Sequence, residues 1–247
     1  MSEPQEDSFI SHLVELRDRL LRAVVAVVVV FVCLMPWAGD IYDILAHPMM
    51  TALPEGTKMI ATGVVTPFFV PMKVTLLVAF VIALPFVLYQ AWCFIAPGLY
   101  AHEKRLGLPL VVGSTVLFLA GMAFCYFFVF GTVFKFIAQF APKSITPAPD
   151  IEQYLAFVMS MFLAFGITFE VPVIVIVLVK LGIVDVAKLK EARPYVIVGA
   201  FVIAAVVTPP DVVSQLMLAV PMCLLYELGI FLSRFVTRTR VDEAVSS

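Results

Sequence analysis

Two carboxylates in otherwise basic surroundings are the first residues of this chain that can do specific binding chemistry. Glu15 lies in an amphipathic segment, 8–19, with Arg19 one helical turn later, and Glu103 stands beside Lys104 in a short polar stretch. A carboxylate can accept the two forked N–H donors of a guanidinium, a geometry that lysine cannot copy. Both acids also fit a simpler interpretation, in which Glu15 forms a helix-surface ion pair and Glu103 is a solvated loop charge.

Three further polar residues, Glu170, Glu227 and Gln90, lie inside long apolar runs. A carboxylate within a bilayer costs on the order of 2.5–3.5 kcal/mol, so such a residue should face a bundle interior or a wet cavity. The similar depth of the three predicts either a hydrated recess open to the cytoplasm or an internal hydrogen-bonded clamp between helices. We expect Glu170 to face such a recess, near the depth of Gln90, rather than dry packing.

Catalytic and metal chemistry are not indicated. The four cysteines lie apart in apolar runs and the three histidines are scattered, and neither spacing is typical of a metal site. No catalytic serine, histidine and aspartate set and no glycine-rich phosphate loop can be assembled. We therefore expect no enzyme, no metal and no cofactor, and the lack of a basic tail or patch indicates no nucleic-acid partner.

Membrane-spanning helices must hold these residues in place. The chain has 247 residues, of which 62% are hydrophobic and only 14% charged, and its mean hydropathy is +1.07. A soluble domain is about 25% charged, and a chain of this size folded in water cannot hide so much apolar surface. The composition excludes a soluble enzyme, a disordered chain and a collagen-like repeat, and it predicts an all-α integral membrane protein.

Six apolar runs approach the roughly 20 residues that a crossing needs. Their uneven lengths predict a cupped, uneven bundle in a single polytopic domain, 1–247, that ends in a polar tail, 236–247. Prolines punctuate the connections, of which the longest is 39–71 and the shortest is the Pro-Pro turn at 208–211. The predicted helices are 20–38, 74–101, 106–134, 153–179, 194–210 and 212–233.

Lysine and arginine predict the orientation in the membrane. Six crossings place both termini on one side, which then carries twelve basic residues against four on the other. The positive-inside rule places both termini in the cytoplasm. The four basic residues on the opposite side are Lys58, Lys73, Lys135 and Lys143.

Thr208 and Gln215 flank the Pro-Pro turn near the non-cytoplasmic side. A hydroxyl and an amide inside a membrane seek hydrogen-bond partners. The two side chains can bond to each other or to a polar group on a partner helix, and the sequence leaves both alternatives open.

Five motifs are spread along nearly the whole chain, over about residues 8 to 235. They are Ser11-His-Leu-Val-Glu-Leu-Arg17, Phe94-Ile-Ala-Pro-Gly-Leu-Tyr-Ala-His-Glu103, Phe165-Gly-Ile-Thr-Phe-Glu-Val-Pro172, Arg193-Pro-Tyr195 and Thr208-Pro-Pro-Asp211. Together these motifs resemble those of the TatC family, the multispanning receptor subunits of the twin-arginine protein translocase. The six predicted crossings with both termini inside rest on the apolar runs and the basic residues, independently of these motifs.

The resemblance implies a six-helix cupped fold and a role in the export of folded proteins. Family members bind twin-arginine signal peptides, assemble with single-span TatB-like and TatA-like subunits, and draw on the protonmotive force. The resemblance also implies a homo-oligomer within the complex, in the bacterial cytoplasmic (inner) membrane. Carboxylates matching Glu15 and Glu103 lie in the family's signal-peptide site, to which we also assign Arg17 and Phe94. Thr208 and Gln215 are assigned to partner-helix packing, and Pro48 and Asp211 to further functional positions.

Two other functions remain as alternatives. One is a proton-coupled small-solute transporter that uses Glu170, although the sequence shows no inverted repeat and no matching pair of broken helices. The other is a membrane scaffold without a ligand of its own. In any case, six helices about 10 Å across cannot enclose a hole wide enough for a folded domain. Such a domain has a radius of gyration of about 13 Å at 100 residues. We therefore expect a receptor and assembly platform rather than a conduit.

Overall fold

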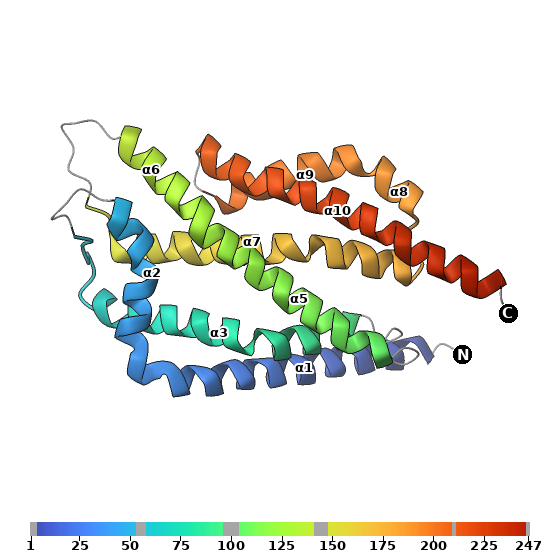
Figure 1. The fold of residues 1–247 in the computed structure, drawn as a ribbon. Helices are drawn as coiled ribbons and strands as arrows, with labels where there is room; N and C mark the ends of the chain where they lie inside the picture. Colours follow the sequence, from blue (N-terminus) through green and yellow to red (C-terminus); the bar gives the residue numbers. More distant parts are fainter. Residues whose placement is uncertain (1–3, 53–57, 96–103, 141–147, 209–210, 246–247) are drawn as a thin grey trace. The chain divides into compact units, whose positions relative to one another are not determined.

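Helices make up nearly all of the described chain in this computed structural model (Figure 1). Within the described ranges, β pairing is limited to one isolated parallel bridge between Ile60 and Asp150. The all-α fold class predicted from composition is therefore confirmed. The structure describes residues 4–52, 58–95, 104–140, 148–208 and 211–245.

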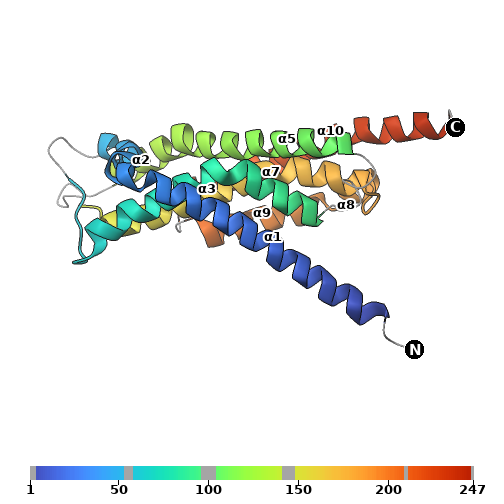
Figure 2. The same cartoon turned by 90° about the horizontal axis from the view of Figure 1, so that it is seen from below.

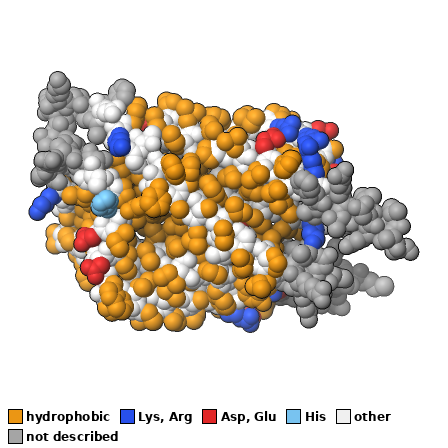
Figure 3. All heavy atoms as spheres, viewed as in Figure 1, with side chains coloured by type: hydrophobic (Ala, Val, Ile, Leu, Met, Phe, Trp, Pro, Cys, Tyr) orange, Lys and Arg blue, Asp and Glu red, His pale blue; other side chains and the backbone are white. Residues whose placement is uncertain are grey.

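Five of the described helical stretches are long and apolar enough to cross a bilayer. A sixth, α9 (Arg193–Val207), has only 15 residues, or about 22 Å of rise against a hydrocarbon core of about 30 Å. On the face shown in Figure 3, apolar side chains dominate and charged side chains lie towards the helix ends. The five longer spans are His12–Thr51, Thr66–Ile95, Gly107–Ile137, Ile151–Lys180 and Val212–Arg234.

The chain forms two compact units, of which the first comprises residues 1–44 and 68–115. Its first helix, α1 (Pro4–Leu34), is continuous (Figure 2), so the predicted amphipathic segment and most of the first predicted span form one element. The unit also holds most of α3 (Thr66–Ile95) and the first half of α5 (Lys104–Phe124).

A buried hydrogen bond joins α3 to α5 inside this unit. The indole Nε1 of Trp92 donates to Oγ of Ser114 at 2.8 Å, and both side chains are buried. An indole N–H in an apolar environment is costly without an acceptor. The serine hydroxyl supplies that acceptor and so fixes the pairing of the two helices near this level.

The long connection predicted at 39–71 contains a helix, which corrects the sequence interpretation. α1 continues through a short 3-10 turn, Met35–Trp37, directly into α2 (Ala38–Ala52). Pro48 lies inside α2, where proline normally interrupts a helix. Its carbonyl accepts a hydrogen bond from the Thr51 hydroxyl at 3.0 Å, which gives the backbone near the proline a local partner.

The second unit comprises residues 45–67 and 116–247 and is built on α7 (Ile151–Lys180). α10 (Val212–Val245) packs along α7, and α9 runs beside α10 (Figure 1). Gly229 makes this packing close, because a Cβ at that position would lie 3.0 Å from the Cα of Pro172 and from the Cβ of Val175. A side chain at 229 would therefore require Pro172 and Val175 to shift by a few tenths of an ångström.

Several elements in this unit differ from those predicted, and α9 ends at Val207, three residues before its predicted end. The third span runs through a π-helical segment, Cys125–Val129, into α6 (Phe130–Phe140), six residues beyond its predicted end. A short helix, α8 (Val186–Glu191), precedes α9 and was not predicted. α10 continues as a helix to Val245, through most of the stretch predicted as a polar tail.

In the second unit, Asp150 joins the segment around Thr62 to the start of α7. Oδ1 of Asp150 caps the helix by accepting the backbone N–H groups of Glu152 and Gln153, at 2.9 and 3.1 Å. Oδ2 accepts the hydroxyl and the backbone N–H of Thr62, at 2.7 and 3.1 Å. The hydrogen bonds from Thr62 and Gln153 hold the pKa of the Asp150 carboxyl below its usual range. We call this arrangement the Asp150 lock.

Candidate functional site

Glu15 and Arg19 form an ion pair one helical turn apart on α1. Nε and Nη2 of Arg19 both donate to Oε1 of Glu15, at 2.9 and 2.6 Å. The i,i+4 pairing predicted from the sequence is therefore confirmed. The Glu15 side chain stays 41% exposed and that of Arg19 is 23% exposed. This carboxylate is thus reachable from solvent, and it already holds a guanidinium.

A groove of about 350 Å³ opens over the same helix face. Helical spacing also offers Arg22 as a partner for Asp18, but Asp18 instead accepts Nε and Nη2 of the adjacent Arg17 at 3.0 and 2.8 Å. Two acidic and two basic side chains surround the opening. The groove is lined by Val14, Glu15, Asp18, Arg19 and Arg22.

The end of α3 supplies an aromatic contact to this helix. Phe94 stacks on His12, with ring centroids 4.4 Å apart and planes inclined by 17°. Cys93, the preceding residue, lies within hydrogen-bonding reach of the Arg19 side chain. Sequence reasoning assigned Phe94 only through the family resemblance and did not single out His12, although His12 lies within the first motif. Glu103 lies outside the described residues.

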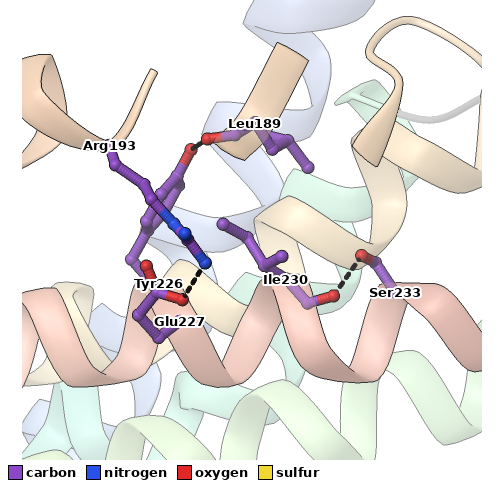
Figure 4. A network of polar contacts seen from close by, with 6 residues as sticks. All are labelled: Leu189, Arg193, Tyr226, Glu227, Ile230 and Ser233. Carbon is purple, nitrogen blue, oxygen red and sulfur yellow. Dashed lines mark hydrogen bonds and ion pairs between the residues drawn. The ribbon is translucent and has the colours of Figure 1, made fainter. Parts of the chain in front are cut away.

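A second guanidinium–carboxylate pair joins different helices (Figure 4). Nη2 of Arg193, at the start of α9, donates to Oε2 of Glu227 on α10 at 2.6 Å. Beside it the hydroxyl of Tyr226 donates to the backbone carbonyl of Leu189 in α8 at 2.8 Å. For Glu227 this geometry corresponds to the predicted helix clamp rather than to a wet recess. We call Leu189, Arg193, Tyr226 and Glu227 the α10 clamp.

Glu170 and Gln90 are both buried, with 7% and 6% of their surface exposed. Glu170 lies on α7, where nearly half of the residues are buried, so its surroundings differ from the open recess that the sequence predicted. Gln90 belongs to the first unit and Glu170 to the second. A shared function of the two side chains remains a prediction.

Thr208, Gln215 and Asp211 all make hydrogen bonds around the junction of α9 and α10. The Thr208 hydroxyl donates to the carbonyl of Ala204 at 2.8 Å, and the Gln215 amide donates to the carbonyl of Phe201 at 3.3 Å. Both groups therefore reach the backbone of α9. Oδ1 of Asp211 accepts the N–H of Ser214 at 2.7 Å and so caps the start of α10.

These apolar spans and charged helix ends define a polytopic α-helical membrane protein. The profile of the family described as "Sec-independent protein translocase protein (TatC)" matches residues 11–221. The Escherichia coli K12 protein of that name is 50% identical over 235 residues, 95% of this chain and 91% of that protein. Its counterpart from Azotobacter chroococcum is 52% identical over 242 residues, covering 98% and 94% of the two chains.

A solved structure gives the same answer for the fold. The chain superposes on the "Crystal Structure of Twin Arginine Translocase Receptor- TatC" with a TM-score of 0.80 and 40% sequence identity, covering 92% of this chain and 99% of the other. The protein belongs to the TatC family, as its motifs indicated. It is therefore a membrane-spanning component of a Sec-independent, twin-arginine protein translocase.

Proposed function

We propose that this chain is the receptor that binds twin-arginine signal peptides of folded cargo. The observation that carries the proposal is the contact between Glu15 and Arg19, in which two nitrogens of one guanidinium donate to a solvent-accessible carboxylate. A signal-peptide arginine can make the same contact. We place this site at the cytoplasmic face of the inner membrane, with both termini in the cytoplasm, on the distribution of basic residues.

The energetics of such a contact suit reversible recognition. Hydrogen bonds to charged groups contribute about 1.5–3 kcal/mol each. Two arginines together with an apolar signal segment then reach micromolar affinity, about −8 kcal/mol. In this proposal Glu103 receives the second arginine, Arg17 keeps Asp18 neutralised, and Phe94 stacked on His12 holds the end of α3 beside the site.

Single-span partner subunits are the second half of the proposed function. α9 is shorter than the bilayer core, so lipid must thin beside it or another helix must cover it. Gln215, which is half-buried, offers a polar group at that edge for a TatB-like or TatA-like helix, and Thr208, buried against α9, lies at the same turn. Transport by the assembled, homo-oligomeric complex then draws on the protonmotive force, with Pro48 and Asp211 supporting the non-cytoplasmic end.

Peptide binding tests the receptor role directly. The full chain in lipid nanodiscs should bind a fluorescent twin-arginine signal peptide, and a twin-lysine peptide should bind at least tenfold more weakly. Glu15→Gln should reduce binding to a similar extent. Glu191→Gln is the matched control, because it removes an exposed carboxylate on α8 outside the groove. Equal binding of both peptides would remove the receptor function.

Disulfide crosslinking tests the partner surface. Cysteine at 215 should crosslink to a cysteine in the span of a single-span subunit, and cysteine at 208, a buried position, should do so more weakly. Val116→Cys on α5 is the control, since Val116 is exposed on a different helix. Equal crosslinking from all three positions would mean that no specific edge exists.

A further inference from the structure

A groove of about 470 Å³ lies in the second unit, between the third span and the start of α10. The π-helical segment and α6 supply all of its lining except Val213, which comes from α10. No step of the proposed signal-peptide recognition uses this groove. We call it the Lys135 groove, lined by Phe127, Phe128, Gly131, Thr132, Lys135, Phe136, Gln139 and Val213.

The inner part of the groove is apolar and open. Phe127 and Phe128 are 72% and 64% exposed, because the π-helical turn places both rings on the outside of the span. A Cβ built on Gly131 would meet no atom within 4 Å, so the floor of the groove is empty at that point. The Thr132 hydroxyl donates to the carbonyl of Phe128 at 2.8 Å, which leaves it directed at the backbone.

The outer part of the groove carries one cation. Lys135 is exposed and lies five residues before the end of α6, or about 7.5 Å along the axis. Gln139, one turn later, adds an amide with two donors. The two phenylalanines lie about 11 Å deeper along the helix. No acidic residue is among the side chains that line the groove.

We propose that the Lys135 groove binds one anionic phospholipid, with its phosphate on Lys135 and Gln139 and an acyl chain against Phe127 and Phe128. The cation and the amide donors lie at headgroup depth and suit a phosphate, and the apolar slot below them suits an acyl chain. From Phe127 to Gln139 the lining extends about 18 Å along the helix axis. A helix that crosses the bilayer core is about 30 Å long, so the groove is too short to cover one. A lysine near an anionic membrane surface contributes about fivefold to association.

Native mass spectrometry of the delipidated full chain in detergent tests the proposal. Phosphatidylglycerol should be retained about fivefold more than phosphatidylcholine of the same chain length. Lys135→Gln should abolish that preference. Lys58→Gln is the matched control, because Lys58 is exposed and lies outside the groove, and it should leave the preference unchanged. Thermal melting of each variant shows that it is folded.

Filling the groove gives an independent arm. Gly131→Leu places a side chain in the empty space and should reduce retention of both lipids. Equal retention of the two lipids by the wild type, or a preference that survives Lys135→Gln, overturns the proposal. So does retention unchanged by Gly131→Leu. A Thr132→Cys crosslink to a single-span subunit, with neither lipid retained by the wild type, would assign the groove to a protein helix instead.

Discussion

Two guanidinium–carboxylate pairs in this protein have the same shortest contact, 2.6 Å, and different consequences. Glu15 and Arg19 lie four residues apart on one helix, whereas Arg193 and Glu227 lie 34 residues apart and join α9 to α10. The clamp side chains are the more exposed, at 41% and 49%. What separates the two pairs is therefore connectivity: the first lies within one helix, so a ligand can open it without moving a helix, whereas the second joins α9 to α10.

Reversing the first pair is expected to have the largest effect. Glu15→Arg combined with Arg19→Glu keeps an ion pair on α1, so the unfolding free energy should change by no more than about 0.5 kcal/mol. Twin-arginine peptide binding should fall at least tenfold, because the carboxylate moves one turn and an added cation faces the peptide. Peptide titration and thermal melting of the same preparation measure both. Full binding by the reversed pair would show that the position of the acid does not matter.

Cutting the clamp should affect stability and leave recognition intact. Tyr226→Phe removes a hydroxyl that donates to Leu189 from a buried position, which should lower the unfolding free energy by about 1 kcal/mol. Glu227→Gln, at a more exposed contact, should cost about 0.5 kcal/mol. Denaturation in detergent measures both losses, and peptide affinity per folded molecule should stay at the wild-type value. Weaker peptide binding in either variant would contradict the division between the two pairs.

Removing the resident cation of the first pair should have a smaller effect of opposite sign. Arg19→Gln leaves Glu15 without its intrahelical partner, so an incoming arginine no longer has to displace one. A helix-surface pair of this kind is worth about 0.3–0.5 kcal/mol, and the peptide should therefore bind about twofold more tightly. Arg193→Gln, which frees the other carboxylate, should leave peptide affinity unchanged. An affinity that falls in Arg19→Gln would mean that Arg19 itself contacts the peptide.

Acid should weaken the Asp150 lock with the smallest effect. Because the folded-state pKa of Asp150 lies below its usual range, its stabilisation is complete above the unfolded-state pKa of about 3.9. It is lost as pH falls through the lower folded-state value. The melting temperature should therefore drop below about pH 4, and Asp150→Asn should show a smaller acid-dependent drop. Identical pH profiles for wild type and variant would assign the acid sensitivity to other groups.

Local spacing predicted the ion pair on α1 well and the α10 clamp only as an alternative. The pairing of Glu15 with Arg19 follows from the 3.6-residue period alone, and the structure has it. The same rule failed for Asp18, since the neighbouring Arg17 reaches it equally well. The partner of Glu227 could not be read from any period, because a contact across 34 residues depends on how α8 and α9 turn back onto α10.

The same limit explains the misread connection. Gly39 and Pro48 are turn-forming residues, and they outweighed the apolar residues between them, so α2 was predicted as an irregular stretch. Glu170 was expected to be wet because a carboxylate in a span is costly. Its burial depends on how closely neighbouring helices pack on α7, which no single-sequence pattern specifies.

The Asp150 lock can form only after a delay during synthesis of the chain. Thr62 and Asp150 are 88 residues apart, and chains are synthesised at about 5–20 residues per second. For roughly 4–18 seconds the nascent chain therefore contains Thr62 but not yet Asp150. During that interval α1, which carries Glu15, has already been synthesised. The hydrogen bonds between Thr62 and Asp150 cannot yet form. The nascent chain can thus expose Glu15 and Arg19 before the Asp150 lock has formed.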